Sequence, residues 1–173
     1  SGTVVTGTLS GAALHEGDEL IVARTQQATK IRSIQQHGAV SSSALPRTRC
    51  ALNLTHLSTD DIHRGDVLLF NDSCYSTEVF DGSVELAFGT GALGTAVSPV
   101  RNGGGYTLHI GTARRAASLR FLGTDHSNVR IRFAGALPLI PGDRFLLRRT
   151  GDDITVAGEK LGAELEAEGL EVL

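Results

Sequence analysis

The stretch Gly2-Thr3-Val4-Val5-Thr6-Gly7-Thr8-Leu9-Ser10-Gly11 opens the chain, and His15-Glu16-Gly17-Asp18-Glu19-Leu20 follows it closely. The first stretch combines β-branched residues with bounding glycines, which is typical of a β-strand that ends in a tight turn. The second places a Glu-Gly-Asp turn directly before another apolar run. Together they predict the first two strands of a small antiparallel β-barrel.

Short runs of this kind recur along the chain, separated by turn residues such as glycine, proline and serine. Five candidate strands fall in the first 70 residues: Thr3–Leu9, Glu19–Ala23, Thr29–Gln36, Arg49–Leu54 and Asp66–Phe70. A second series follows in the rest of the chain: Ser83–Phe88, Tyr106–Gly111, Ala116–Leu122, Asn128–Phe133, Arg144–Arg149 and a shorter Ile154–Val156. No segment shows a long period near 3.6 residues, so the pattern favours strands over helices.

This pattern predicts an all-β fold made of two consecutive antiparallel β-barrels. The first barrel is expected over residues 1–72 and the second over residues 83–173, with a polar, turn-rich junction over 73–82. The tail Glu159–Leu173 alternates Glu with Leu and Ala, and fits either a helix or a final strand.

The net charge of −3 conceals an uneven distribution. Residues 101–149 hold nine arginines against Asp125 and Asp143, a net charge of +7, whereas residues 150–173 carry a net charge of −6. An arginine-rich segment is a candidate surface for phosphate, because the guanidinium group pairs with phosphate in a bidentate way. The alternative is that these arginines pair with the acidic tail or stay solvated.

Catalysis is not expected of this chain. Gly89-Thr90-Gly91-Ala92-Leu93-Gly94 matches the dinucleotide fingerprint by letter, but no helix pattern follows, and Arg114 and Arg115 stand where an acid is required. A hairpin loop is the better prediction for this stretch. The chain also lacks a Walker-type phosphate loop and a Gly-x-Ser-x-Gly nucleophile turn, so neither GTP hydrolysis nor nucleophilic catalysis is predicted.

Metal binding and a membrane segment are not expected either. His56 and His63 flank Asp60 and Asp61, but their spacing fits no standard ligand set, so a surface loop is predicted. The sequence shows no apolar stretch of membrane-spanning length and no signal peptide. Two free thiols in a cytosolic protein are favoured over a disulfide. The absence of Met suggests a piece of a longer protein, with N-terminal processing as the alternative.

Arg47 and Arg49 alternate in the run that leads into Cys50-Ala51-Leu52-Asn53-Leu54, so both are expected on one face of a strand. An arginine beside a barrel core either pairs with an internal acid or binds an anionic ligand. On physical grounds alone, the internal pair is favoured.

Several motifs come in a family-specific order. The opening Thr-Val-Val-Thr-Gly-Thr-Leu-Ser-Gly, then Ile31–His37, Arg49–Leu54 and Ile62–Leu68, resemble the second domain of the selenocysteine-specific elongation factors (SelB). His109-Ile110-Gly111-Thr112-Ala113 resembles the His-x-Gly-Thr-Ala segment of their third domain. Two further segments resemble the closing strands of that domain: Pro141–Arg148 and Ile154–Gly158. The opening motif alone is shared by many translation factors.

The resemblance implies a non-catalytic part of a factor that carries selenocysteinyl-tRNA to the ribosome. The second domain of the family receives the aminoacyl end in a pocket with positively charged residues, and Arg49 matches one of these. His37 sits in a family position and is the second candidate for this pocket. The family's other charged pocket residues, an Asp-Arg pair, would precede Ser1. A fixed guanidinium suits this task, because it favours an ionised selenol over a neutral serine hydroxyl.

The family's third domain packs on the GTPase domain and touches the tRNA stem. We therefore expect tRNA contacts from the +7 segment, with Arg114, Arg115 and Arg120 as candidates. The implied partners are selenocysteinyl-tRNA, the ribosome and the protein's own G domain, in the cytoplasm and without a membrane. No cofactor is expected in this chain, and the resemblance places GTP and Mg²⁺ in the full-length protein.

A second interpretation stays open: a ribosome-docking or interaction module of another translational GTPase, without an aminoacyl pocket. The two interpretations differ at Arg49, which faces an open pocket in the first and is ion-paired or points to solvent in the second.

Overall fold

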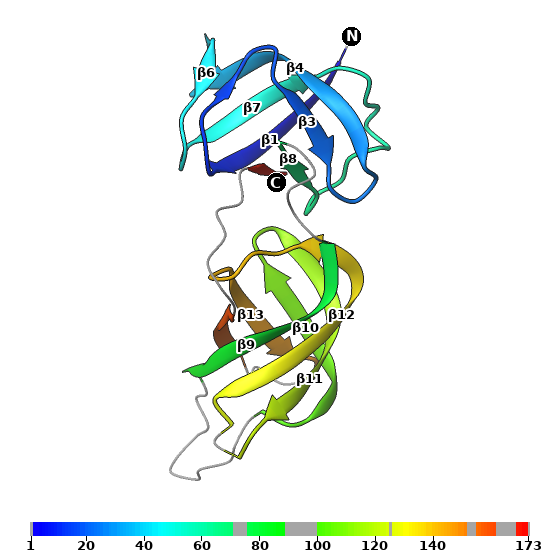
Figure 1. The fold of residues 1–173 in the computed structure, drawn as a ribbon, viewed down its shortest axis with the longest axis vertical. Coiled ribbons are helices and arrows are strands. Elements are labelled where there is room, and N and C mark those ends of the chain that lie inside the picture. The colour runs from blue at the N-terminus through cyan, green and yellow to red at the C-terminus, as the bar shows by residue number, and fades with distance from the viewer. Residues whose placement is uncertain are drawn as a thin grey trace. The chain divides into compact units, whose positions relative to one another are not determined.

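The structure is a computed structural model that describes residues 2–70, 76–88, 100–124, 126–151, 155–161 and 169–172, all of them in strands, turns and loops (Figure 1). The chain divides into two compact units, each built around its own sheet. The first unit comprises Ser1–Ser76, Leu137–Leu139 and Glu166–Leu173, and the second comprises Thr77–Ala136 and Ile140–Leu165. The predicted all-β fold with two antiparallel barrels is confirmed.

The first unit contains nine strands among the described residues. They are β1 (Thr3–Ser10), β2 (Leu14–His15), β3 (Glu19–Val22), β4 (Gln27–Gln36), β5 (Ala39–Ser41), β6 (Ser43–Ala44), β7 (Arg49–Leu54), β8 (Val67–Leu69) and β15 (Gly169–Val172). The sheet order is β3-β8-β15-β1-β7-β4-β5, and β3 also pairs with β4. That extra pairing joins six strands into a ring, while β2 and β6 form a separate two-stranded ribbon.

The core of the first barrel follows the period of two along its strands. On β7 the buried residues alternate with half-buried ones, and β1 shows the same alternation. The side chains that fill the interior are aliphatic and almost completely buried: Leu9, Leu20, Ile34, Leu52 and Leu68. Cys50 belongs to this core as a free thiol, and burial raises its pKa, so it stays neutral.

The second unit is a closed antiparallel barrel with the order β10-β11-β12-β9-β14-β13. Its strands are β9 (Ser76–Phe88), β10 (Gly103–Ile110), β11 (Ala113–Leu122), β12 (Asn128–Pro138), β13 (Arg144–Arg149) and β14 (Thr155–Lys160). Leu108, Ile131 and Leu147 are buried in its interior. The ring of Phe80 packs edge-on against Phe133 and Phe145, with centroids 6.0 and 5.1 Å apart.

Some boundaries lie elsewhere than the sequence suggested. β9 begins at Ser76, inside the stretch that was expected to be a junction. The predicted tail Glu159–Leu173 contains strand residues in both of its described parts. β14 reaches Lys160, and β15 pairs with β1 and β8 of the first unit. The Gly89–Gly94 loop lies outside the described residues. The partition into residues 1–72 and 83–173 stays a prediction.

One kind of turn starts three of the strands. In His15–Asp18, His63–Asp66 and Ile140–Asp143, the aspartate carboxylate accepts the backbone N–H of the first residue, at 2.7, 2.8 and 2.8 Å. The glycine before each aspartate has a φ of +94°, +90° or +88°, a conformation that only glycine adopts without strain. β3, β8 and β13 each begin directly after the aspartate, so this turn sets where the strand starts.

Close packing of β9, β14 and β13 in the second barrel requires two glycines beneath one aromatic ring. Phe145 on β13 lies opposite Gly158 on β14. A Cβ at Gly158 would overlap the Phe145 ring and the carbonyl oxygen of Ser83, and a Cβ at Gly82 would lie 2.8 Å from Phe145 Cε1. The ring therefore occupies the space that side chains would need, and it covers the junction of β9, β14 and β13.

We expect Gly158→Ala to destabilise the chain by about 3 kcal/mol, because overpacking against a backbone oxygen cannot be relieved by a change of rotamer. Thermal unfolding followed by circular dichroism measures this loss. Gly104→Ala is the matched control, since nothing lies within 4 Å of a Cβ at that position, and it should unfold at nearly the parent temperature. Equal melting temperatures for the two variants would contradict the proposed close packing.

Candidate nucleic-acid interface

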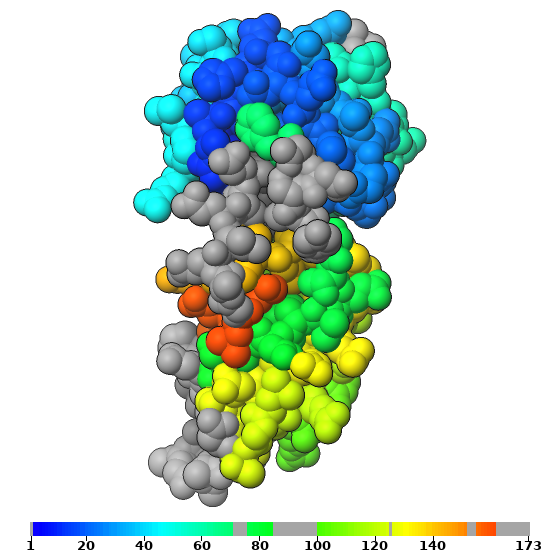
Figure 2. Space-filling model, viewed as in Figure 1, coloured from blue at the N-terminus to red at the C-terminus, as the bar shows by residue number. Residues whose placement is uncertain are grey.

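The outer face of the second barrel gathers cationic side chains from neighbouring strands. On this face His109 of β10 lies opposite Arg114 of β11, and Arg120 of β11 lies opposite Arg130 of β12. Residues that are directly opposite on antiparallel strands point to the same side of the sheet. In Figure 2 the yellow-green and yellow atoms of β11 and β12 form a continuous outer surface of this unit. This face is the candidate nucleic-acid interface.

A hollow of about 400 Å³ lies on this face, lined by residues of β10, β11 and β12. Its polar lining includes Ser118, Arg120, Arg130 and Arg132. The guanidinium of Arg130 donates to both carboxylate oxygens of Asp81, at 2.7 and 2.8 Å. These hydrogen bonds and the charge of Arg130 lower the pKa of Asp81, so the acid is ionised at neutral pH.

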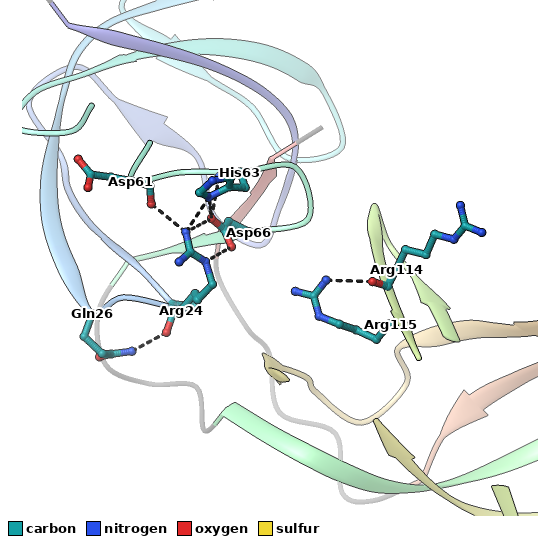
Figure 3. A network of polar contacts seen from close by, with 8 residues as sticks. Arg24, Gln26, Asp61, His63, Asp66, Arg114 and Arg115 are labelled. Atoms are coloured by element: carbon teal, nitrogen blue, oxygen red, sulfur yellow. Dashed lines mark hydrogen bonds and ion pairs between the residues drawn. The ribbon is translucent and has the colours of Figure 1, made fainter. Parts of the chain in front are cut away.

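The three arginines predicted to contact tRNA do not share one face. Arg114 and Arg120 are exposed, whereas Arg115 is half-buried on the opposite side of β11. The Arg115 guanidinium donates to the backbone carbonyl of Arg114 at 3.0 Å (Figure 3). The outer face of β11 therefore presents Arg114 and Arg120 together, with Arg115 turned away from them.

His109 contributes no charge to this face at neutral pH. Partial burial lowers its pKa, and the nearby charges of Arg114 and Arg148 lower it further. The imidazole is therefore a neutral group between two cations. Sequence reasoning used His109 as a family marker and missed its place in the face, although it occupies an alternating position on the predicted strand Tyr106–Gly111.

Arg49 begins β7, opposite Thr8 of β1, and is exposed on the outside of the first barrel. No described residue forms an ion pair or a side-chain hydrogen bond with it. The internal acid that the sequence favoured as a partner is thus not found in the described part of the chain. Arg47 lies in the preceding turn with a φ of +63°, so the expectation that it shares a strand face with Arg49 was wrong.

His37 is exposed in the two-residue turn between β4 and β5. Its φ is +51° and that of Gly38 is +80°, as a type I′ hairpin turn requires. The side-chain amide of Gln36 donates to the Thr48 hydroxyl at 2.8 Å, which ties the end of β4 to the residue that precedes Arg49. His37 directly follows Gln36 and Arg49 directly follows Thr48, the two residues that this hydrogen bond joins.

A buried polar atom lies on the same strand as Arg49. The side-chain oxygen of Asn53 is buried and has no hydrogen-bond partner among the described residues. A Cβ at Gly2 would overlap this oxygen, so only glycine fits there beside Asn53. An unpaired buried carbonyl is unfavourable, and it marks this end of β1 and β7 as incomplete in hydrogen bonding.

Of the four residues that raised the question of a metal site, His63 and Asp61 lie in a network around the Arg24–Asp66 ion pair (Figure 3). Arg24 donates to the two carboxylate oxygens of Asp66 at 2.8 and 2.9 Å, and to the backbone carbonyl of Asp61 at 2.9 Å. It also lies 3.0 Å from Nδ1 of His63. A guanidinium can only donate, so this nitrogen accepts. No cluster of three metal-ligating residues occurs in the described ranges.

Asp66 is the buried centre of this network, with 4% of its surface exposed. Burial raises the pKa of its carboxyl group, but hydrogen bonds from Arg24 and from the His63 backbone, and the charge of Arg24, outweigh that effect. The net result is a lowered pKa. The ionised carboxylate holds Arg24 to the turn that starts β8.

Known proteins resemble this chain over most of its length, although no family model matches it. The selenocysteine-specific elongation factor of Desulfomicrobium baculatum is 31% identical over 166 residues, which are 92% of this chain and 25% of that protein. Elongation factor 1-alpha of Pyrobaculum arsenaticum is 29% identical over 114 residues, 65% of this chain and 24% of that protein. This chain thus spans about a quarter of the length of these relatives.

Two solved structures show the same fold. The crystal structure of a bacterial selenocysteine-specific elongation factor EF-Sec matches with a TM-score of 0.75 at 19% identity, over 92% of this chain and 25% of that one. The apo form of SelB from Methanococcus maripaludis matches with a TM-score of 0.72 at 20% identity, over 93% of this chain and 39% of that one. In the described ranges, no helix is long and apolar enough to cross a membrane.

The fold and these likenesses make the chain similar to the β-barrel domains of translation elongation factors, the class to which these relatives belong. Within that class its resemblance is to the selenocysteine-specific elongation factors, which confirms the family predicted from the sequence motifs.

We expect the first barrel to lose stability in acid through Asp66. Its pKa is lower in the folded than in the unfolded state, so its contribution is complete above the unfolded value of about 3.9 and disappears as the pH falls through the folded value. Asp66→Asn should cost about 2 kcal/mol at pH 7 and should weaken the pH dependence below pH 4. Urea unfolding at pH 7 and at a series of lower pH values measures both effects.

The control for this experiment is Asp60→Asn, which changes an exposed carboxylate of the same loop. It should keep the parent stability and the parent pH profile. An Asp66→Asn variant as stable as the parent at pH 7, and equally sensitive to acid, would show that the Arg24 network does not hold this barrel.

Proposed function

We propose that this chain is the part of a selenocysteine-specific elongation factor that holds the aminoacyl end and the stem of selenocysteinyl-tRNA for delivery to the ribosome. It has no catalytic role in this proposal. A G domain elsewhere in the longer protein would bind GTP and Mg²⁺ in the cytoplasm. The observation that carries the proposal is that Arg49 is exposed and pairs with no described residue, in the strand that resembles the family's pocket strand.

The chemistry of the aminoacyl group supports a role for Arg49. A selenol ionises at a much lower pH than a hydroxyl, so selenocysteine presents an anion where serine presents a neutral group. A charge-assisted hydrogen bond from a guanidinium is about twice as strong as a neutral one. Arg49 has no acidic partner in the described part of the chain that would compete for this bond. His37 lies beyond the Gln36–Thr48 link at the same edge of the barrel, and we assign it to the pocket as the weaker contributor.

In this proposal the outer face of the second barrel binds the tRNA stem. Arg114 and Arg120 point outward there, and backbone phosphates are the groups that exposed arginines bind without reading the sequence of the bases. Arg115 is half-buried and bonded to the Arg114 carbonyl, so its contribution to binding is smaller.

A second candidate function is a ribosome-docking module of another translational GTPase. The similarity of elongation factor 1-alpha over 65% of this chain favours it, because the likeness is then not restricted to selenocysteine-specific factors. In that case Arg49 points to solvent and does not distinguish one aminoacyl group from another.

We expect Arg49→Ala to lower the affinity for selenocysteinyl-tRNA about tenfold, the lower end of what a hydrogen bond to a charged group contributes. The affinity for seryl-tRNA should not change. The measurement is a comparison of the two aminoacylated forms of one tRNA, bound to the longer GTP-loaded protein. Arg49→Lys should restore part of the preference, because it keeps the charge but loses the bidentate geometry.

Arg64→Ala is the matched control for Arg49, because Arg64 is an exposed arginine of the same barrel with no side-chain hydrogen bond or ion pair to any described residue. It should bind both tRNAs as the parent does. A parent protein that binds the two aminoacylated forms equally well would reject the selenocysteine pocket and favour the docking module.

The stem contact is tested with a second pair of variants. Arg114→Ala should weaken tRNA binding and reduce the slope of log affinity against log salt by about one, because one phosphate contact is lost. Arg115→Ala should leave the slope unchanged, since its guanidinium bonds to the backbone. The idea fails if neither variant alters the salt dependence of tRNA binding.

A further inference from the structure

Asn102 and Gly103 form a pair of residues with a chemical reactivity of its own. The sequence contains four asparagines, and Asn102 is the one that precedes a glycine. The backbone nitrogen of the next residue can attack an asparagine side chain, and glycine obstructs this attack least because it has no Cβ. Asn102 directly precedes β10, Gly103 is the first residue of that strand, and both are exposed.

The backbone around Gly103 has room to move. Pairing between β10 and β11 is irregular between Gly103 and Tyr106, and among the described residues β13 pairs with β10 only from Tyr106 onward. No described atom lies within 4 Å of a Cβ at Gly103 or Gly104. Few cross-strand partners and open surroundings are features of a segment with low local stability. The Gly103 nitrogen can therefore approach the Asn102 side chain without disrupting the barrel.

The Asn102 side chain is held in an orientation that suits this attack. The backbone N–H of Phe121 donates to Asn102 at 2.7 Å. A backbone N–H can only donate, so the side-chain atom that it contacts is the oxygen Oδ1 and not the NH₂ group. Negative charge develops on Oδ1 when Cγ is attacked, and a donor that is already in place stabilises such a charge. Because Asn102 is exposed, water can reach the NH₂ group that must leave.

We propose that Asn102 is a site of spontaneous deamidation, in which the Gly103 nitrogen is the nucleophile and the Phe121 N–H stabilises the oxyanion. The Gly103 nitrogen loses its proton and forms a bond to Cγ, and the bond from Cγ to Nδ2 breaks with release of ammonia. Water then opens the cyclic imide at either of its carbonyl groups, which gives aspartate or isoaspartate. One water is consumed and one ammonia is released, without oxidation or reduction. No ligand takes part, so this proposal is independent of the proposed function.

The product changes the charge of the hollow on the outer face of the second barrel. Asn102 lines this hollow together with Arg120, Arg130 and Arg132. Deamidation replaces a neutral amide with a carboxylate beside these three guanidinium groups, whose like charges repel one another. The new negative charge is attracted to them, so the surroundings favour the product. The reacted chain is more acidic than the parent by one charge.

The pair Asp81–Gly82 shows what prevents a related reaction. An aspartate that precedes a glycine can form the same cyclic imide with loss of water. Arg130 donates to both carboxylate oxygens of Asp81, at 2.7 and 2.8 Å, and lowers the pKa of this acid, so it is ionised at neutral pH. An ionised carboxylate is a poor electrophile, and Gly82 is also paired with Lys160 in the β9–β14 ladder. We therefore expect Asp81 to stay unchanged under conditions that convert Asn102.

The experiment incubates the unaltered chain at neutral pH and follows its proteolytic peptides by mass spectrometry. The peptide that contains Asn102 should gain the mass expected when OH replaces NH₂, and it should separate into an aspartate and an isoaspartate form. A synthetic peptide of residues 100–108 measures the same reaction without the fold. We expect the folded chain to react about fivefold faster than this peptide, the effect of one net hydrogen bond on a rate.

Asn53 and Asn128 are controls within the same sample, because each precedes a buried apolar residue with a bulky side chain. Both should stay unmodified. Asn102→Gln is the control variant, since its longer side chain would have to close a larger ring. On isoelectric focusing the parent should develop an acidic band with time, and the variant should not. Two results would overturn the proposal: a folded chain that reacts no faster than the peptide, or an acidic form whose modification lies at another residue.

Discussion

Closure of each sheet into a ring is the constraint on which the rest of this structure depends. A strand in a closed barrel pairs on both sides, so it cannot slip by one residue without turning its apolar side chains to solvent. On β11 this places Leu119 in the core and Arg120 outside, and on β7 it places Cys50 inside and Arg49 outside. The positions of the candidate binding residues are thus consequences of the hydrophobic pattern. Closure also leaves no free edge on the second barrel's ring, whereas the first sheet keeps an edge at β5, which pairs with β4 alone among the described strands.

The two rings close in different ways. The second barrel closes through β14, where Gly158 lets the backbone of β9 and β14 approach beneath Phe145. The first barrel closes through β15, whose residues follow the whole of the second unit in the sequence. The second unit is therefore an insertion in the chain between two strands of the first ring. Contacts of such long sequence separation form slowly, because the intervening loop must be closed before they form.

Local pattern predicted most of the strands but not the long-range pairing. The expected runs beginning at Arg49, Asn128 and Arg144 start where β7, β12 and β13 start, because apolar residues alternate there with a period of two. β9 extends back to Ser76 through a stretch in which only Val79 and Phe80 are apolar, and it is a strand because it pairs with its neighbours in the barrel. The same limit applies to the site. The alternation of side chains along a strand could have shown that Arg114 and Arg115 point to opposite faces. The Asp81–Arg130 pair joins residues 49 positions apart, and no pattern in the sequence indicates it.

Pairing divides the arginines of this protein into two groups. Arg24 and Arg130 each bind both oxygens of one aspartate, and each ties together segments that are distant in the sequence. Arg49, Arg120 and Arg132 have no such partner among the described residues. An isolated exposed arginine is well solvated and by itself indicates nothing, because a surface ion pair adds at most about 1 kcal/mol. Arg120 and Arg132 differ in that the register holds both of them next to Arg130, where the described residues supply one carboxylate, that of Asp81, for three guanidinium groups. Their mutual repulsion works against the stability of the barrel, and an anion bound between them would relieve it.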